Sequence, residues 1–411
     1  MNNIEIREGE ARGVLLSNDV KYIIEELNKH GFRADVVGGP VRDFLLGKQP
    51  HDYDITTSAR PEQVEEVFSG KRIIETGIKH GTVTLVLNGE NYEITTYRID
   101  GEYLDSRHPE SVEFTTELAE DLSRRDFTMN ALCYNPKQGI TDLHGGEADI
   151  KSRIIRAVGD PEKRFTEDAL RIIRGIRFAA VLGFDIEEKT AEAMEKCAHL
   201  MEKVSAERIF TEWKKLISGD FAYDVIDKYR HIIRVFLPEV ADEPLPEKAR
   251  FDISEPIVRM IALFKGAGGE RYRGAMMRLK TDSGTRDAGL LVLTSMKNYD
   301  TSSPLAIKIL MSELGAEIAS LRLKVEYLLG MREHEKMFEV EKIIERREPY
   351  RVSDLDINGS DLISLGIKGP RVGQEMRALL RLVMEGRLKN QRAALISSVK
   401  SRLPSDNAKI K

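Results

Sequence analysis

The spacing of hydrophobic residues changes along the chain, and the change falls near residue 150. Before it, short runs rich in β-branched residues alternate with stretches of helical spacing, and Gly, Asn or Asp bounds the runs. The runs predict strands over 34–37, 54–57, 82–87 and 92–98. Helical spacing predicts helices over 19–29, 40–46 and 61–68. This part is therefore expected to form one α/β domain with a small mixed sheet.

Beyond residue 150 the strand signals stop and helical periodicity dominates. Helices are expected over 162–182, 187–203, 206–217, 285–297, 304–314, 316–329 and 372–385. The region 236–256 contains four prolines and many acidic residues, so we expect a boundary there and another near 346–356. The predicted fold class is thus an α/β head followed by an all-α remainder.

The composition is that of a folded protein, with 41% hydrophobic and 32% charged residues among 411. Two cysteines, Cys133 and Cys197, are too few for a disulfide framework or a cysteine zinc site, which favours a reducing cytoplasm. The first ten residues contain no apolar core of the kind found in secretion signals. No apolar run approaches the length of a membrane span.

The net charge of -5 does not by itself indicate a nucleic-acid partner. Charge is unevenly distributed, however, because residues 367–402 contain nine basic side chains and only two acidic ones. A basic segment on an acidic protein is a candidate surface for phosphate contact. A solvated helix face is the alternative, and charge alone favours that alternative.

The first candidate site is the segment ADVVGGPVRDFLLG. A predicted strand ends at Val37, and Gly38 and Gly39 then form a tight turn where backbone can approach a ligand closely. Pro40 suits the first position of a helix, and Arg42 in its first turn can bond a triphosphate. Many strand–turn–helix units use Gly-Gly for geometry alone, so this turn needs support from its surroundings.

That support comes from HDYDIT. Asp52 and Asp54 are two residues apart on a predicted strand, which places both carboxylates on one face. Two such acids can hold Mg²⁺ while substrate phosphates supply further oxygen ligands, and two metal ions clamp an in-line displacement. Glu93 on the strand NYEITTYR is a candidate third catalytic carboxylate. The alternative is that these acids are merely solvent-exposed residues of a strand. For Asp52 and Asp54, the Gly-Gly turn upstream favours the functional interpretation.

Seven motifs together resemble the class II tRNA nucleotidyltransferase and bacterial poly(A) polymerase family, which is part of the polymerase-β-like superfamily. They are GGPVRDFLLG, HDYDIT, KHGTV, EITTYRIDGEYLDSRHP, DLSRRDFTMNAL, DLHGG and EDALRIIRGIRF. They follow the family's order over roughly 36–184, and GIKGPRVG resembles the family's C-terminal tail. The resemblance is strong over the first half of the chain and weak over the rest.

The resemblance implies a division into four parts. These are a catalytic head over 1–146, a neck over 147–218 that selects the base, a helical body over 219–345 and a helical tail over 346–411 that contacts tRNA. It implies template-independent addition of CCA, or its terminal part, to the 3′ end of tRNA with CTP, ATP and Mg²⁺. An A-adding enzyme and a poly(A) polymerase, which use ATP alone, stay open. A non-catalytic tRNA-binding module is disfavoured because the motif residues are complete.

By the same resemblance, Asp52 and Asp54 bind the catalytic metals. Gly38, Gly39, Arg42 and Arg125 contact the nucleotide, and Asp126 stabilises the head. A purely structural salt bridge is the alternative for Arg125 and its neighbour Arg124.

The neck motif carries base selection in the resembled family. Asp168, Arg171, Arg174 and Arg177 recur every three residues and form a stripe on a predicted helix that Thr166 caps. Asp168 and Arg171 are expected to bond the Watson–Crick edge of the base, with the other two arginines as further nucleotide contacts. An Asp accepts and an Arg donates, so the pair suits the amino group and ring acceptors of cytosine and adenine. Guanine and uracil leave a buried group unpaired. A salt-bridged helix face is the alternative.

Two further segments distinguish members of the family. Residues 97–110 resemble a flexible loop that CCA-adding and A-adding enzymes keep, although His108 stands where the family more often has Arg. In the tail, Lys368, Gly369 and Arg371 are expected to contact phosphates of the tRNA elbow. Oligomeric state is not indicated by the sequence, and Trp213 is expected in the neck core.

Overall fold

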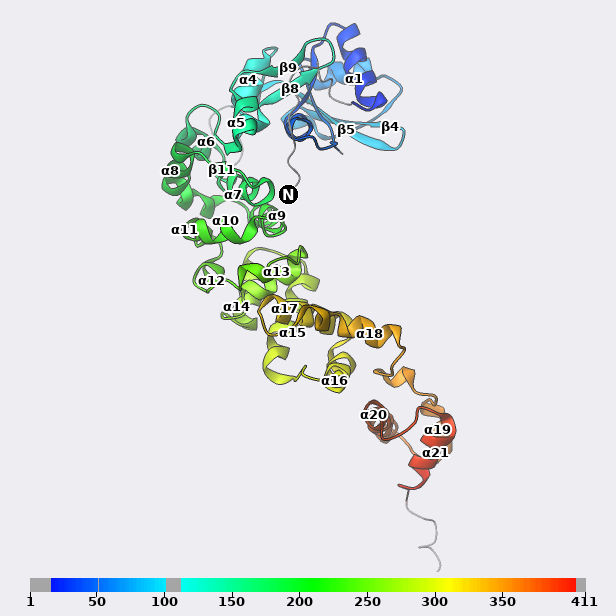
Figure 1. Ribbon diagram of the computed structural model, residues 1–411. Helices are drawn as coiled ribbons and strands as arrows, with labels where there is room; N and C mark the ends of the chain where they lie inside the picture. The colour runs from blue at the N-terminus through cyan, green and yellow to red at the C-terminus, as the bar shows by residue number, and fades with distance from the viewer. Residues whose placement is uncertain (1–15, 51, 101–111, 404–411) are drawn as a thin grey trace, which may run out of the picture. The chain divides into compact units, whose positions relative to one another are not determined.

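The computed structural model describes residues 16–50, 52–100 and 112–403 (Figure 1). His51 and the segment 101–111, with His108, lie outside the described residues. The chain divides into two compact units, Met1–Pro238 and Glu239–Lys411. The first unit holds the sheet and the candidate catalytic residues.

A seven-stranded mixed sheet organises the first unit, as the sequence predicts. In spatial order its strands are β3 (Arg72–Gly77), β4 (Thr82–Leu87), β5 (Glu90–Thr96), β2 (Asp54–Thr57), β1 (Ala34–Val37), β8 (Leu132–Asn135) and β9 (Gly139–Asp142). The β2–β5 pair is parallel and the other neighbouring pairs are antiparallel. A parallel pair at the centre places Asp54 directly opposite Glu93.

Helices and turns accompany this sheet. They are α1 (Asn18–Lys29), α2 (Gly39–Leu45), α3 (Pro61–Val67), η1 (Ile78–His80), α4 (Leu118–Ser123), η2 (Thr128–Asn130) and α5 (Gly146–Ser152). Strand β6 (Arg98–Asp100) pairs antiparallel with β7 (Val112–Phe114) in a separate two-stranded sheet. Helix α1 begins where the Ser17 hydroxyl accepts the Val20 N–H, and its buried residues recur at helical spacing. Helices α1 and α2 both contact β1.

The rest of the first unit is almost entirely helical. It contains β10 (Ile154–Ile155), α6 (Pro161–Glu167), α7 (Leu170–Leu182), β11 (Asp185–Ile186), α8 (Glu188–Cys197), η3 (Ala198–Lys203), α9 (Ala206–Ile217), α10 (Ala222–Lys228) and α11 (Arg230–Ile233). Helix α7 packs along α9, where Trp213 is fully buried against Phe236. The expectation that Trp213 belongs to the core is therefore confirmed.

The structure corrects the predicted neck helix. Residues 162–182 do not form one helix, because α6 ends at Glu167 and α7 begins at Leu170. Asp168 at the break has extended backbone angles, φ -140° and ψ 101°. Thr166 is not a helix cap, since its hydroxyl donates to the backbone oxygens of Glu162 and Lys163 within α6. The predicted stripe therefore starts at a bend.

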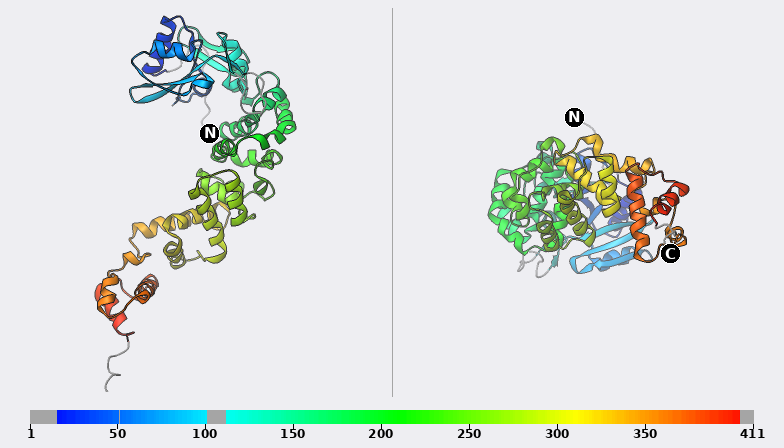
Figure 2. Two further views of the ribbon diagram at one scale, coloured as in Figure 1. Left: turned by 180° about the vertical axis from the view of Figure 1, so that it is seen from behind. Right: turned by 90° about the horizontal axis from the view of Figure 1, so that it is seen from below.

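The second unit consists of helices and the loops that join them, and it contains no strand among its described residues (Figure 2). Its elements are α12 (Pro238–Ala241), η4 (Lys248–Arg250), α13 (Pro256–Leu263), α14 (Gly269–Arg278), α15 (Ser283–Asn298), α16 (Pro304–Leu314), α17 (Ala316–Leu328), η5 (His334–Phe338), α18 (Glu339–Glu345), η6 (Val352–Asp354), α19 (Gly359–Ser364), α20 (Pro370–Met384) and α21 (Arg392–Lys400). One buried apolar cluster runs from Ile307 in α16 to Val399 in α21. Hydrophobic packing is thus continuous across residue 345, where the sequence predicts a boundary between body and tail.

Candidate active site

The glycine turn packs directly against a predicted nucleotide-binding arginine. Gly38 has φ 77° and ψ -124°, a conformation that residues with a Cβ rarely adopt, and its N–H donates to the Leu132 oxygen at 2.9 Å. A Cβ at Gly38 would lie only 3.3 Å from Nη1 of Arg125. The glycine therefore allows the guanidinium to approach the backbone of the turn.

The candidate metal-binding carboxylates lie beside this turn. Asp54 opens β2 and is exposed, as are Asp52 and the register partner of Asp54, Glu93. Partial desolvation by the surrounding protein raises the pKa of the Asp54 carboxyl, the Arg125 guanidinium acts against this rise, and Asp52 adds to it. Asp52 and Asp54 are thus close enough to repel each other, and a cation would relieve that repulsion.

A buried carboxylate holds Arg125 in place. Asp121 in α4 accepts from Nη2 of Arg125 at 3.1 Å and from Nη2 of Arg124 at 2.7 Å. The hydroxyl of Thr56, which lies on the same face of β2 as Asp54, donates to Asp121 at 3.2 Å. Burial alone would raise the pKa of Asp121, but the two guanidinium groups lower it overall. Arg125 is therefore both salt-bridged and within electrostatic range of Asp54, one of the candidate metal-binding carboxylates.

The donor set suits a divalent cation that is also bound by its substrate. Two exposed carboxylates supply hard oxygen ligands of the kind that Mg²⁺ prefers, and phosphates complete such sites. Among the residues that the structure describes, no group of three or more His, Cys, Asp or Glu side chains is arranged to hold a metal. Glu93 as a third catalytic carboxylate thus stays a prediction.

Arg42 connects the glycine turn to helix α7 through a series of hydrogen bonds. Its Nη1 donates to Oδ1 of Asn130 at 2.8 Å, and the Asn130 amide donates to Asp126 at 3.1 Å. Asp126 also accepts from Nε and Nη2 of Arg174, at 2.9 and 2.6 Å. The motif DLSRRDFTMN therefore joins the glycine turn to the arginine stripe.

The pairing with Arg174 lowers the pKa of Asp126. Burial by itself would raise the pKa of the carboxyl, but Arg174 and hydrogen bonds from Asn130 and the Phe127 backbone lower it to about 2. The pKa of Arg174 is raised overall. Burial by itself would lower this pKa, but the carboxylates of Asp126, Glu212 and, less strongly, Asp168 raise it by more. Arg174 thus lies within electrostatic range of the predicted base reader.

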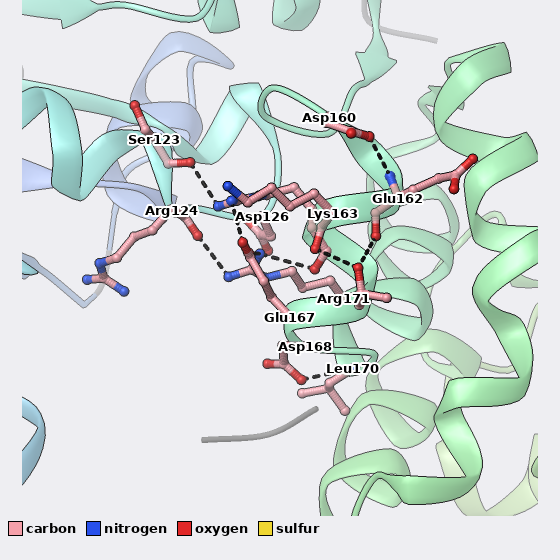
Figure 3. Close-up of polar contacts among 12 residues, drawn as sticks. Ser123, Arg124, Asp126, Asp160, Glu162, Lys163, Glu167, Asp168, Leu170 and Arg171 are labelled. Atoms are coloured by element: carbon pink, nitrogen blue, oxygen red, sulfur yellow. Dashed lines mark hydrogen bonds and ion pairs between the residues drawn. The ribbon is translucent and has the colours of Figure 1, made fainter. Parts of the chain in front are cut away.

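The two predicted base-reading side chains have separate partners (Figure 3). The Asp168 carboxylate accepts the N–H of Leu170 at 3.1 Å, and its other oxygen accepts Nη2 of Arg208 at 2.8 Å. Arg171 is buried and donates to the backbone oxygens of Arg124 and Arg164, at 2.8 and 3.2 Å. The structure places both residues at the bend, where the Arg171 backbone N–H donates to the Asp168 backbone oxygen at 3.0 Å while the two side chains bind different partners.

Glu167 completes this arrangement. It accepts from Arg164 at 2.6 Å and from Arg171 at 3.0 Å, while Arg164 also donates to the Ser123 oxygen at 3.0 Å. Two arginines oriented by one glutamate therefore bind the carbonyl groups at the end of α4 (Figure 3). An open cavity of about 320 Å³ adjoins them, lined by Ile99, Ala119, Glu120, Ser123, Arg124, Lys163, Arg164 and Glu167.

Several residues of this network were not predicted from the sequence. They are Asp121 as the partner of Arg125, Asn130 between Arg42 and Asp126, Glu167 and Arg208 at the bend, and Glu212, which accepts Nε of Arg177 at 3.0 Å. The only available signal was their presence in or near arginine- and carboxylate-rich motifs. All predicted head and neck residues nevertheless lie in one unit, and the Arg42–Asn130–Asp126–Arg174 contacts connect the glycine turn to α7.

The predicted tail residues lie in the second unit. Lys368, Gly369 and Arg371 are exposed at the start of α20. A cavity of about 330 Å³ is lined there by Gly366, Ile367, Lys368, Arg371, Gln374, Glu375, Val399, Arg402 and Leu403. Arg402 pairs with Glu375 at 3.0 Å, so one basic side chain of the cavity is already neutralised.

Two expectations from the sequence concern disulfide bonds and membrane-spanning helices. Cys133 and Cys197 are both buried and free. No helix in the described part of the chain has the length and apolar character needed to cross a membrane.

The mixed sheet, with its glycine turn and adjacent carboxylates, has the fold of a polymerase-β-like nucleotidyltransferase. Residues 34–156 match the family model described as the poly A polymerase head domain, and residues 183–243 match a probable RNA- and SrmB-binding site of polymerase A. The CCA-adding enzyme of Bacillus cytotoxicus is 34% identical over 383 residues, 91% of this chain and 95% of the relative. That of Lactococcus lactis subsp. lactis is 36% identical and covers 93% of this chain and 97% of its own length.

Solved structures agree. The Bacillus stearothermophilus CCA-adding enzyme in complex with CTP is 32% identical, with a TM-score of 0.78, over 93% of this chain and 96% of that one. The Thermotoga maritima CCA-adding enzyme has the same fold at 20% identity and a TM-score of 0.66, over 94% of this chain and 96% of that one. The chain belongs to the CCA-adding enzyme family, a family of nucleotidyltransferases.

Proposed function

We propose that this chain adds the CCA sequence to the 3′ end of tRNA, using CTP and ATP without a nucleic-acid template and releasing pyrophosphate. The observation that carries the proposal is full-length similarity to CCA-adding enzymes, one of them solved with CTP, together with an intact set of candidate site residues. Because the relatives cover the chain almost completely, the proposal extends to its helical C-terminal unit.

Asp52 and Asp54 would hold Mg²⁺ in this scheme. When bound, the cation would supply Lewis-acid chemistry, stabilising charge on the phosphates and lowering the pKa of the attacking hydroxyl. The backbone of Gly38 and Gly39 lets the triphosphate approach closely, and Arg42 and Arg125 provide guanidinium donors beside it. Asp121 fixes Arg125 through a buried ion pair, so that this donor is oriented before the nucleotide arrives.

Asp168 and Arg171 would select the base. The Asp168 carboxylate accepts a hydrogen bond from the amino group that cytosine and adenine share, and Arg171 donates to a ring acceptor. One Asp168 oxygen already accepts the Leu170 N–H and the other accepts Arg208. These two bonds limit the rotation of the carboxylate and leave a lone pair on each oxygen for the base. Arg171 exchanges one of its backbone acceptors for the base, and Arg174 and Arg177 contact the nucleotide further along α7.

The tail residues Lys368, Gly369 and Arg371 would contact phosphates of the tRNA elbow, because they are exposed beside a partly basic cavity. The division into head, neck, body and tail at residues 146, 218 and 345 stays a prediction. The cytoplasmic location is also a prediction, motivated by two cysteines that form no disulfide.

The decisive experiment offers the purified chain three tRNAs, ending before the first C, before the second C and before the final A, with each nucleotide in turn. Sequencing of the product ends should show C, C and A added in order and then termination. Incorporation of A alone, on the last substrate, would instead indicate an A-adding enzyme, and A tails on unrelated RNA would indicate a poly(A) polymerase.

The catalytic assignment is tested in the same assay. Asp52→Asn and Asp54→Asn should each reduce incorporation to background with the fold intact. Glu62→Gln, which neutralises an exposed acid in α3, serves as the control and should keep normal activity. An active Asp54→Asn enzyme would disprove the role of this carboxylate.

A further inference from the structure

One aromatic ring gathers three arginines from two different segments. The guanidinium carbon of Arg177 lies 3.7 Å from the ring centroid of Phe178, and those of Arg42 and Arg174 lie at 5.2 and 5.5 Å. Arg42 follows the glycine turn in α2, whereas the other two arginines belong to α7. The ring therefore bridges the phosphate turn and the helix that carries the predicted base reader.

The ring itself is held firmly. Phe178 is 3% exposed, and the Phe127 ring packs against it edge-on at 5.9 Å and 85°. Phe127 lies in the same motif as Asp126 and Asn130, which bind Arg174 and Arg42. The position of the ring is thus fixed by the same segment that orients two of the arginines.

Bringing three guanidinium groups together has an electrostatic cost. Burial lowers the pKa of Arg177, with Glu212 and Asp126 opposing this effect and Arg174 and Arg42 adding to it. Each arginine has a carboxylate partner: Asp43 for Arg42, Asp126 for Arg174 and Glu212 for Arg177. Arg42 also donates to Asn130, so the hydrogens left for a ligand are the remaining ones on its Nη atoms. The face of the ring attracts all three cations.

A ring face and a carboxylate attract a guanidinium in different ways. A carboxylate uses up N–H donors, whereas a π face attracts the planar cation and leaves its N–H edge available. Phosphate oxygens need those edges, because bidentate hydrogen bonds are what make Arg effective in binding phosphate. The ring can therefore position arginines for an anion without competing with that anion.

We propose that Phe178 is a positioning residue for the triphosphate, holding Arg42 and Arg177 so that the N–H groups that Asp43, Asn130 and Glu212 do not bind are available to the phosphate oxygens of CTP and ATP alike. This inference rests on the proposed function and deepens it, since it assigns the phosphate part of the nucleotide to a cluster centred on one ring. It also separates two roles along α7: the bend at Asp168 selects the base, and the turn around Phe178 binds the phosphates.

The test is Phe178→Leu, which keeps an apolar side chain and removes the π face. The KM values for CTP and ATP should both rise by about tenfold, equivalent to about 1.4 kcal/mol, with a smaller change in kcat. The inhibition constant of pyrophosphate, which has no base, should rise by the same factor. The preference for CTP and ATP over UTP and GTP should not change, because the base reader is untouched.

Two further variants separate positioning from packing. Phe178→Tyr retains the ring face and should restore nucleotide affinity to within about twofold of the original chain. Phe165→Leu removes an equally buried ring from α6, where no cation–π contact to arginine is found among the described residues. Phe165→Leu should lower the melting temperature without changing the KM values or the inhibition by pyrophosphate.

Three outcomes would overturn the inference: unchanged KM values in Phe178→Leu, equal increases in Phe165→Leu, or a rise for one nucleotide but not for pyrophosphate. Failure of the proposed function has a different signature. In that case the unmodified chain itself adds neither C nor A to any of the three tRNAs.

Discussion

Arg174 donates two hydrogen bonds to one oxygen of Asp126, from Nε at 2.9 Å and from Nη2 at 2.6 Å. The carboxylate belongs to the family's head domain, and the arginine lies 48 residues further along, in α7. Through Asn130 the same carboxylate is linked to Arg42 beside the glycine turn. The position of the arginine stripe is therefore tied to the turn by one buried ionised group.

The first prediction concerns acid stability. The pKa of Asp126 falls from 3.8 to about 2 in the folded protein, so its contribution to stability is present above pH 4 and is lost as the pH falls toward 2. A shift of this size corresponds to about 2 kcal/mol. Unfolding measured by circular dichroism between pH 5 and pH 2 should therefore show a steeper loss of stability in the original chain than in Asp126→Asn.

At neutral pH, Asp126→Asn should itself destabilise the protein by about 2 kcal/mol, because Arg174 loses its ionised partner. Asp149→Asn is the control, since Asp149 also pairs with an arginine, Arg156 at 3.1 Å, but neither residue is among the predicted site residues. A pH profile of Asp126→Asn that matches the original chain would show that another group is responsible.

The second prediction concerns Arg208. If Arg208 limits the rotation of Asp168, then Arg208→Met should reduce discrimination against UTP and GTP by about tenfold while leaving the protein folded. The measurement is the ratio of kcat/KM values for correct and incorrect nucleotides. In an Asp168→Ala background the same substitution should have no further effect on that ratio, because the two residues act together.

Arg230→Met is a matched control for this prediction. The Arg230 side chain is 28% exposed and pairs with Asp227 at 3.0 Å, while Arg208 is 29% exposed and pairs with Asp168 at 2.8 Å. Equal losses of selectivity in the two variants would point to a general effect on the helices.

The third prediction addresses Glu93. Because no group of three or more His, Cys, Asp or Glu side chains among the described residues is arranged to hold a metal, Glu93→Gln should reduce kcat/KM by less than tenfold, whereas Asp54→Asn should abolish activity. Both variants are assayed over a range of Mg²⁺ concentrations. If Glu93→Gln is as inactive as Asp54→Asn and is rescued by high Mg²⁺, Glu93 is a third ligand.

The fourth prediction concerns the tail. Replacing Lys368 and Arg371 together by Ala should weaken tRNA binding and make it less sensitive to salt. The slope of log K against log salt should change by about one to two units, as expected for the loss of one or two phosphate contacts. The double replacement of Arg387 and Lys389 by Ala removes the same charge elsewhere in the basic segment and should leave the slope unchanged.

Much of the head fold follows from local sequence signals. Strands β1, β2 and β4 coincide with β-branched runs, whose side chains suit a pleated surface, and β5 overlaps the run predicted over 92–98. Strands β3, β8 and β9 were not predicted. Strand β8, for example, is the four-residue run LCYN, which is buried on both faces. A buried run this short has no alternation, so nothing in its spacing distinguishes it from a loop.

The candidate site shows where local signals end. The pairing of Asp54 with Glu93 was partly predictable, since both lie on expected strands, but their register depends on the β2–β5 pairing across the sheet. The bend at Asp168 was missed because helical spacing continues through it. Its cause is a local bond from the Leu170 N–H to the Asp168 carboxylate, which competes with the helix. Arg208 lies 40 residues from Asp168, and no spacing rule connects them.

The placement of Arg171 also bears on how nucleotide choice can evolve. On the proposed assignment, one side chain both recognises the base and binds the carbonyl group of Arg124 at the end of α4. A substitution that alters the accepted nucleotide therefore also loosens an attachment between two segments of the catalytic unit. Variants with new specificity should arise more readily when a second change, at Arg164 or Glu167, restores that attachment. On this assignment, a change in nucleotide specificity at Arg171 also changes the packing of α7 against the end of α4.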